Sequence, residues 1–220
     1  MPIFEKTFTP QAASATAIAP SQAIFANVPM TLTAQSQIVI DSGGLTRRIQ
    51  IQCTNGIPAV IFTVRGLNSV GSLLTETITG VGPTPVVSVN YYTSITSITP
   101  NTTDPSLVII GTNGQVGSPV FAINHYVRTA YAMKVNITGT ITYSIFETFN
   151  DILKPVNMGG TGAVPAIYSL AQDTNLVAET ASSYGRLAMG CTGWAFGTAS
   201  FTNGATISFC VIEPSNSNLG

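Results

Sequence analysis

The sequence has very little charge. Only 8% of its 220 residues are charged, with 8 Lys and Arg against 9 Asp and Glu, whereas globular domains average about 25%. So few basic side chains argue against a protein that binds nucleic acid or an anionic membrane surface. Uncharged polar residues also interrupt every apolar run before the roughly 20 residues that a membrane-spanning helix needs, so we expect neither nucleic acid nor membrane as a partner.

Side chains with reactive or metal-binding chemistry are equally scarce. The sequence has one histidine, His125, and three cysteines, Cys53, Cys191 and Cys210. The cysteines are odd in number and lack CxxC spacing, so we interpret them as reduced, buried, small hydrophobic residues rather than a disulfide or a metal site. No GxSxG motif accompanies His125, and we interpret it as a structural histidine within a strand.

Two further motifs contain residue types that catalytic sites use. Glu147 and Asp151 are carboxylates close in sequence, but they flank the end of a predicted strand, where a solvated turn is a simpler explanation than glycosidase chemistry. The glycine-rich run 159–162 is not followed by the Lys-Ser/Thr of a phosphate-binding loop. We therefore predict a protein that is not an enzyme, with no catalytic residues, no cofactor and no metal.

The residues that are abundant are typical of β-structure. Thr, Val and Ile favour strands, and Gly with Asn favours turns. The segment 46–53 alternates clearly, with Ile49, Ile51 and Cys53 on one face. Strands are also predicted at 59–65, 73–79, 86–99 (one long or bulged strand), 106–111, 119–125, 130–138, 140–147, 186–196 and 205–213, with a hairpin at 113–114 and one short helix within 166–182.

This pattern predicts an all-β fold, an antiparallel β-sandwich of the jelly-roll or immunoglobulin-like kind. We expect the main sandwich to span residues 30–155, and residues 156–220 to form a smaller C-terminal β unit or an extension of the same sandwich. A segment dominated by Ala, Ser, Thr, Gln and Pro, 1–29, precedes them; it could be a disordered tail, and we predict an extended arm. Its apolar residues suggest that it orders against a neighbouring subunit, so we predict a subunit interface at Phe4, Phe8, Ile24 and Phe25.

One pair of segments is similar within the chain. Residues 140–147 and 206–213 are identical or chemically close at every position, and each copy lies shortly after a glycine. Two strands of similar β composition would explain this, and so would an old duplication that produced two related β units.

Part of the sequence resembles a known class of proteins. The strings Phe62-Thr63-Val64-Arg65-Gly66, Thr75-Glu76-Thr77-Ile78-Thr79-Gly80 and Tyr92-Thr93-Ser94-Ile95-Thr96-Ser97-Ile98-Thr99, followed by Val108 to Gly111, are similar to a pattern in virion structural proteins of tailed bacteriophages. The segment from Gly139 to Asp151 resembles the continuation of that pattern. The resemblance covers about 40% of the chain and implies a β-sandwich subunit without catalytic activity.

The sequence therefore leads to one main hypothesis and two alternatives. The first is a capsid decoration (cement) protein that forms a homo-oligomer, with a trimer favoured, and binds the major capsid protein or other virion proteins. The first residues lack a secretory signal, so we expect assembly in the host cytoplasm and a final location in the virion. The alternatives are a neck, collar or tail component, and a carbohydrate- or receptor-binding β-module, although Trp194 is expected in the core rather than on a sugar-binding surface.

Overall fold

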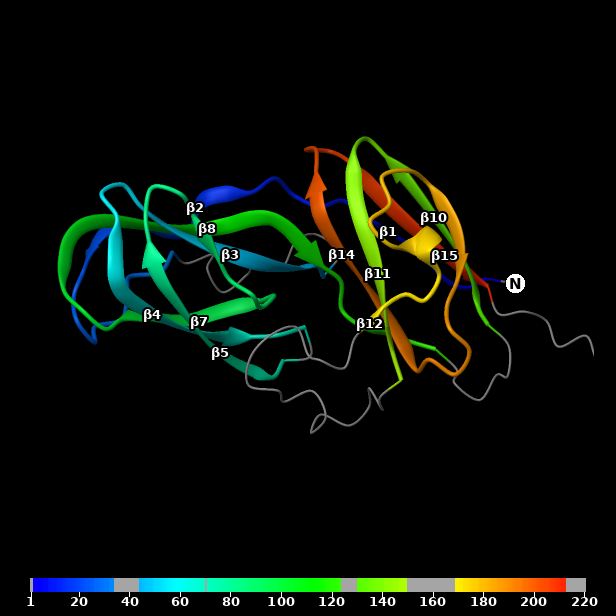
Figure 1. Cartoon of the computed structure of the whole chain (residues 1–220), viewed down its shortest axis with the longest axis horizontal. Coiled ribbons are helices and arrows are strands. Elements are labelled where there is room, and N and C mark those ends of the chain that lie inside the picture. Colours follow the sequence, from blue (N-terminus) through cyan, green and yellow to red (C-terminus); the bar gives the residue numbers. More distant parts are fainter. Residues whose placement is uncertain (1, 34–43, 70, 124–129, 150–168, 213–220) are drawn as a thin grey trace, which may run out of the picture.

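The computed structural model describes residues 2–33, 44–69, 71–123, 130–149 and 169–212. Within these residues the regular elements are β-strands, apart from a single 3₁₀ turn, η2 (Thr174–Leu176). The strands pair in an antiparallel manner, so the predicted all-β, antiparallel, sandwich-like fold is confirmed. They pack into two lobes along the long axis of the molecule (Figure 1).

The first lobe packs a three-stranded sheet, in the order β5-β4-β7, against the strands β2, β8, β3 and β6. Its core contains the alternate residues that the pattern of 46–53 predicts, since Ile49, Ile51 and Cys53 are all buried. The strands of this lobe are β2 (Ser14–Ile24), β3 (Thr46–Cys53), β4 (Ile57–Leu67), β5 (Leu73–Val81), β6 (Val86–Val87), β7 (Ser94–Pro100) and β8 (Asp104–Gly117).

The second lobe packs a four-stranded sheet, in the order β1-β15-β10-β13, against β12, β11, β14 and β9. Its core is rich in aromatic side chains. The strands of this lobe are β1 (Pro2–Phe8), β9 (Phe121–Ala122), β10 (Ala132–Thr138), β11 (Ile141–Thr148), β12 (Ser169–Leu170), β13 (Ser183–Arg186), β14 (Gly193–Phe201) and β15 (Thr206–Ile212).

A close crossing of β8 and β14 joins the two lobes. The strands pair at Gly117 and Gly197; the ring of Tyr91 lies against Gly117, and its hydroxyl lies near Gly197. A Cβ atom at Gly117 would lie 3.2 Å from the Tyr91 ring, and one at Gly197 would lie 3.2 Å from the ring of Phe146. Because glycine leaves this space open, the lobes can share one continuous sheet.

The N-terminal segment is not an arm in this structure. β1 pairs with β15 in the second lobe, whereas β2 pairs with β8 in the first lobe. The buried guanidinium of Arg47 donates hydrogen bonds to the carbonyl oxygens of Gln11 and Ala12, which holds the connection between the two strands. The prediction of an extended arm over residues 1–29 is therefore corrected, because this segment forms strands that pair with other strands of the same chain.

The division into units also differs from the prediction. We expected β10 and β11 in a main sandwich over 30–155, but both contribute to the core of the second lobe with β14 and β15. The chain passes between the lobes from β1 to β2 and again from β8 to β9. The proposed boundary at 155/156 follows a change in composition, whereas the actual division follows strand pairing between segments far apart in sequence.

Several predicted elements are confirmed and others are wrong, among them the strand at 186–196, which is a loop between β13 and β14 over most of its length. The strands at 46–53, 73–79, 140–147 and 205–213 are found with small shifts at their ends. Residues 86–99 instead form β6, an irregular turn and β7, while β8 runs straight through the predicted hairpin at 113–114. The helix expected within 166–182 is reduced to η2 in the part of that segment that the structure describes.

The two similar segments occupy equivalent places in the second lobe. Each follows a turn that crosses from one sheet to the other, from β10 to β11 and from β14 to β15. Both turns contain a glycine with positive φ, Gly139 at 78° and Gly204 at 79°. Since β10 pairs with β15 and β11 with β14, the two crossings are related by an approximate twofold exchange, which favours the duplication interpretation.

Candidate interaction surface

The structure separates the four residues predicted at a subunit interface. Phe8 and Ile24 are each only 1% exposed, Phe8 in the core of the second lobe and Ile24 in that of the first. Phe4 is partly buried, with its ring 5.2 Å from that of Trp194. The prediction is therefore wrong for Phe8 and Ile24, because their apolar surface is already covered by the chain itself.

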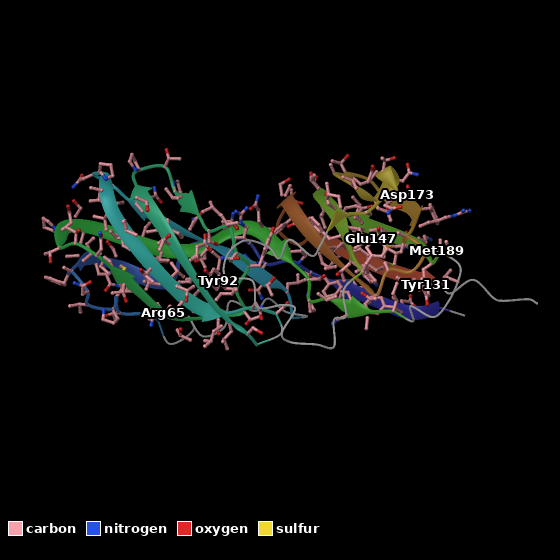
Figure 2. All side chains as sticks on the ribbon, turned by 60° about the horizontal axis from the view of Figure 1, so that its bottom comes forward. Arg65, Tyr92, Tyr131, Glu147, Asp173 and Met189 are labelled. Carbon is pink, nitrogen blue, oxygen red and sulfur yellow. The ribbon has the colours of Figure 1, made fainter. Side chains whose placement is uncertain are left out.

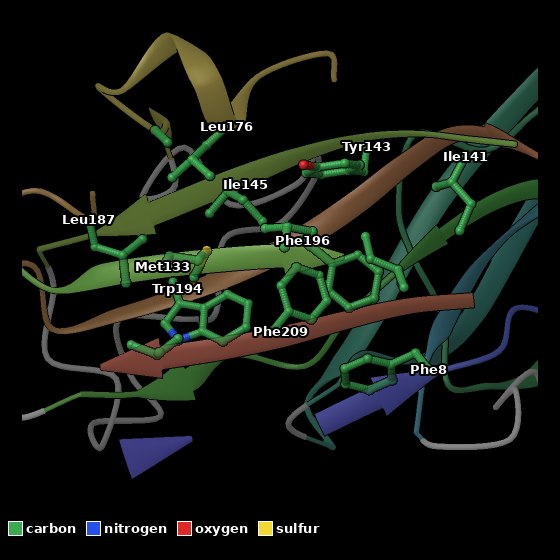
Figure 3. Close-up of a cluster of buried hydrophobic side chains, with 14 of the residues drawn as sticks. Phe8, Met133, Ile141, Tyr143, Ile145, Leu176, Leu187, Trp194, Phe196 and Phe209 are labelled. Carbon is green, nitrogen blue, oxygen red and sulfur yellow. The ribbon is translucent and has the colours of Figure 1, made fainter. Parts of the chain in front are cut away.

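Aromatic contacts join β1 to the core of the second lobe. The ring of Phe8 lies 5.1 Å from Phe196, and Phe196 lies 4.7 Å from Phe209 (Figure 3). Trp194 is fully buried beside them, which confirms the expectation that it is a core residue. Its indole Nε1 has no hydrogen-bond partner among the described residues. This cluster is a structural core and leaves no aromatic surface for a ligand.

Phe25 differs from the other three residues because 58% of its surface is exposed. It begins a tight turn in which the backbone N–H of Val28 donates to the carbonyl of Phe25 at 3.1 Å, with Asn27 in the left-handed region at φ 59°. Asn27 N–H also donates to the carbonyl of Pro100, and Ala26 N–H donates to Thr103 Oγ1. The turn is thus fixed on the loop between β7 and β8.

A second apolar side chain lies on the adjacent strand. Residues of β2 and β8 pair as Gln22 with Val108 and Ile24 with Asp104. Because neighbouring residues of a strand point to opposite faces, burial of Val108 directs Leu107 outward, whereas Phe25 follows the end of β2. Leu107 is 53% exposed, and we call it, together with the exposed residues Phe25, Val28 and Pro105, the distal face.

One carboxylate accompanies the distal face. Asp104 Oδ1 accepts a hydrogen bond from the backbone N–H of Ser106 at 2.8 Å, and this bond lowers the pKa of the Asp104 carboxyl below its usual value. The carboxylate is therefore ionised at neutral pH. Sequence reasoning identified Phe25 but missed Leu107 and Asp104, because the strand expected here began at residue 106 and gave no reason to place β2 beside it.

Glu147 is not in a solvated turn, contrary to the prediction. Its side chain is fully buried, and it accepts hydrogen bonds from Ala188 N–H at 2.7 Å and Gln172 N–H at 3.3 Å. Burial is the main influence on this carboxyl and raises its pKa. Glu147 therefore binds two loops of its own chain to β11. Asp151, the other half of the predicted pair, lies outside the described residues, as do His125 and the glycine-rich run 159–162.

Glu76 has a comparable structural role in the first lobe. It accepts hydrogen bonds from the backbone N–H groups of Val89 and Asn90, and from the Tyr92 hydroxyl at 3.0 Å. Burial and the neighbouring Glu76 both raise the pKa of Tyr92. Glu76 and Tyr92 belong to two of the strings that carry the phage-protein resemblance, so those strings meet in space through this contact.

The prediction that the cysteines are buried is confirmed for two of the three. All three are free thiols, Cys53 and Cys191 are buried, and Cys210 is half-buried. Burial, with a smaller contribution from Glu147, raises the pKa of Cys191 to about 12, so this thiol is not a thiolate nucleophile at neutral pH. Among the residues that the structure describes, no cluster of His, Cys, Asp and Glu could hold a metal ion.

No protein-family model matches the chain, and no curated protein matches it. No helix formed by the described residues has the length and apolar character to cross a bilayer.

Proposed function

We propose that this chain is a non-enzymatic structural protein of a phage virion, a decoration protein that binds the assembled head shell and stabilises it. The observation that carries the proposal is the scarcity of charge in an all-β chain. Of the 17 charged residues, Arg47 and Glu147 are buried, so the surface holds even fewer charges than the composition suggests. A surface without ions is readily desolvated, which favours permanent contact with other subunits.

The carboxylates that are best placed to act in catalysis support a structural role. Glu76 and Glu147 both use their oxygens to accept backbone N–H groups from loops of the same lobe. These hydrogen bonds pair the carboxylates with backbone groups of the same chain and hold its irregular segments in place. The buried position of Trp194 likewise removes the main aromatic candidate for a carbohydrate-binding surface.

The mechanism of stabilisation is mass action. A subunit that binds the assembled shell and not its dissociated proteins stabilises the shell by about 2.7 kcal/mol at a free concentration 100 times Kd. If the decoration protein is itself an oligomer, several weak contacts act together and dissociation becomes slow. Rigid β lobes suit this role because little conformational entropy is lost when they bind.

The test is to count copies of this chain in purified particles of the phage that encodes it, by quantitative mass spectrometry. We expect hundreds of copies, together with restored heat resistance when the purified protein is added back to shells that lack it. Six or twelve copies per particle would instead support a neck, collar or tail component, since those parts have sixfold or twelvefold symmetry. Particles without the chain would overturn the proposal.

A further inference from the structure

One tripeptide, Thr-Asn-Gly, occurs three times in the chain, at 54–56, 112–114 and 202–204. Asparagine followed by glycine is especially prone to deamidation, because glycine has no side chain to hinder the approach of its amide nitrogen to the asparagine side chain. The residues on either side of the asparagine are the same in all three copies. Differences in reactivity among the copies therefore come from the folded structure.

The three copies lie in different surroundings. The first joins β3 to β4 and the second lies within β8, both in the lobe that contains Arg65, whereas the third joins β14 to β15 in the lobe that contains Glu147 (Figure 2). The reaction needs an accessible asparagine side chain, a following amide that can lose its proton, and a backbone that can bend to bring the two together. Burial and hydrogen bonding at each copy therefore set its rate.

Asn113 is the most protected of the three asparagines. It is 8% exposed, and its Oδ1 accepts a hydrogen bond from the backbone N–H of Gln115 at 2.9 Å. Its backbone carbonyl accepts a hydrogen bond from the guanidinium of the buried Arg47 at 3.4 Å. The preceding residue, Thr112, pairs with residues of both β2 and β3. Reaction at Asn113 would require β8 to separate from its neighbouring strands.

Asn55 is exposed, but the amide that would attack its side chain is hydrogen-bonded. The backbone N–H of Gly56 donates to the carbonyl of Cys53 at 3.4 Å, and this bond closes the turn between β3 and β4. Both ends of the turn are anchored in the core, since Cys53 and Ile57 are buried. Because the bond is long, it protects the Gly56 amide only in part.

Asn203 combines an exposed side chain with an attacking amide that the turn leaves unused. Asn203 and Gly204 are both exposed, and a Cβ atom at Gly204 would meet nothing within 4 Å. The bond that closes this turn runs from the backbone N–H of Ala205 to the carbonyl of Thr202 at 3.1 Å. The Gly204 N–H has no hydrogen-bond partner among the described residues, so it is open to hydroxide.

We propose that Asn203 is a site of spontaneous deamidation in the folded protein, while Asn113 is protected from the same reaction. Hydroxide removes the Gly204 amide proton, and the amide nitrogen forms a bond to the side-chain carbon Cγ of Asn203. The bond from Cγ to the side-chain nitrogen breaks, ammonia leaves and a succinimide ring remains. Water then opens the ring at either carbonyl and gives aspartate or isoaspartate, with no oxidation or reduction. The inference does not depend on the proposed function.

The modification would alter a point where two turns meet. The backbone N–H of Thr202 donates to the carbonyl of Thr140 at 2.9 Å, and a Cβ atom at Gly139 would lie 3.0 Å from Cβ of Ala205. The β14–β15 turn therefore packs beside the β10–β11 turn at one edge of the second lobe (Figure 1). Either product adds a negative charge to a chain in which only 8% of residues are charged, and isoaspartate also lengthens the backbone of the turn.

The experiment compares the three asparagines within one sample. The folded full chain is incubated at pH 8.5 and 37 °C, and peptide mapping by mass spectrometry follows the mass increase of each tripeptide. Asn203 is expected to react at least about 10-fold faster than Asn113, with Asn55 between them, as protection by structure requires. In guanidinium chloride the three rates should agree within about twofold, because the flanking residues are identical and the protecting structure is gone.

A pair of variants checks which asparagine gives rise to the acidic form of the protein on ion-exchange chromatography. Asn203→Gln should remove most of this form, since glutamine cyclises far more slowly, whereas the matched control Asn55→Gln should leave most of it. A rate at Asn55 or Asn113 equal to that at Asn203 in the folded chain overturns the proposal. So does an unmodified Asn203 in folded protein under conditions where the unfolded chain reacts.

Discussion

A single added methyl group in β8 tests how tightly β2 is packed. At Gly111, a Cβ atom would lie 2.0 Å from the carbonyl oxygen of Ser14 and 2.5 Å from that of Ala15. Both are backbone atoms, so relief requires β2 to move by more than an ångström and disturbs the pairing of Ser14 with Thr112. Overpacking of this kind costs about 1–3 kcal/mol, and we expect Gly111→Ala to fall at the upper end.

Gly114→Ala is the matched control, because it lies three residues further along β8 and a Cβ atom there meets nothing within 4 Å. Its φ is not in the left-handed region, so the change should lie within about 0.5 kcal/mol of wild type. Thermal unfolding followed by far-UV circular dichroism reports on both lobes. At about 2–4 °C per kcal/mol, Gly111→Ala should lower Tm by roughly 6–12 °C.

Fluorescence adds a second readout to this test. The chain has one tryptophan, Trp194, which lies in the second lobe. Its fluorescence therefore reports on the unfolding of that lobe. The reasoning is refuted if Gly111→Ala unfolds at the wild-type temperature, or if Gly114→Ala loses as much stability. The first result would show that β2 does not lie against β8 at the separation described, and the second that the loss does not come from contact with β2.

Three further predictions follow from the burial of particular side chains. Phe8→Ala should lower the free energy of unfolding in urea by about 3–5 kcal/mol, whereas Phe25→Ala should change it by less than about 0.5 kcal/mol. Similar losses for the two variants would contradict the assignment of Phe8 to the core and Phe25 to the surface. The folded pKa of Glu147 is raised above the unfolded value of 4.5, so its contribution to stability is present below pH 4.5 and is lost as pH rises through the folded pKa. Glu147→Gln should therefore flatten the decline of the urea midpoint between pH 4 and pH 7, and an unchanged slope would assign the decline to other groups. Iodoacetamide at pH 8 should label Cys210 in the folded protein before Cys191, as peptide mapping by mass spectrometry would show, and early labelling of Cys191 would contradict its burial.

Local chemistry was sufficient to predict the class of fold and several of its strands. Alternation places Ile49 and Ile51 on one face whatever strand lies next to them, because successive side chains of a strand point to opposite sides. The glycines before the two similar segments, Gly139 and Gly204, predict turns because their conformation is costly for other residues. These features depend on neighbouring residues alone, so they can be recognised without knowing the tertiary structure.

The tertiary structure decided what each strand pairs with, and hence which side chains remain at the surface. Phe8 and Phe25 have the same side chain and both come from the N-terminal segment, yet β15 and β14 cover one while nothing in the described chain covers the other. Glu147 is polar and lies at a strand end, but two loops distant in sequence enclose it. Contacts between residues far apart in sequence determine burial, and a local pattern does not specify which distant segment will pack against it.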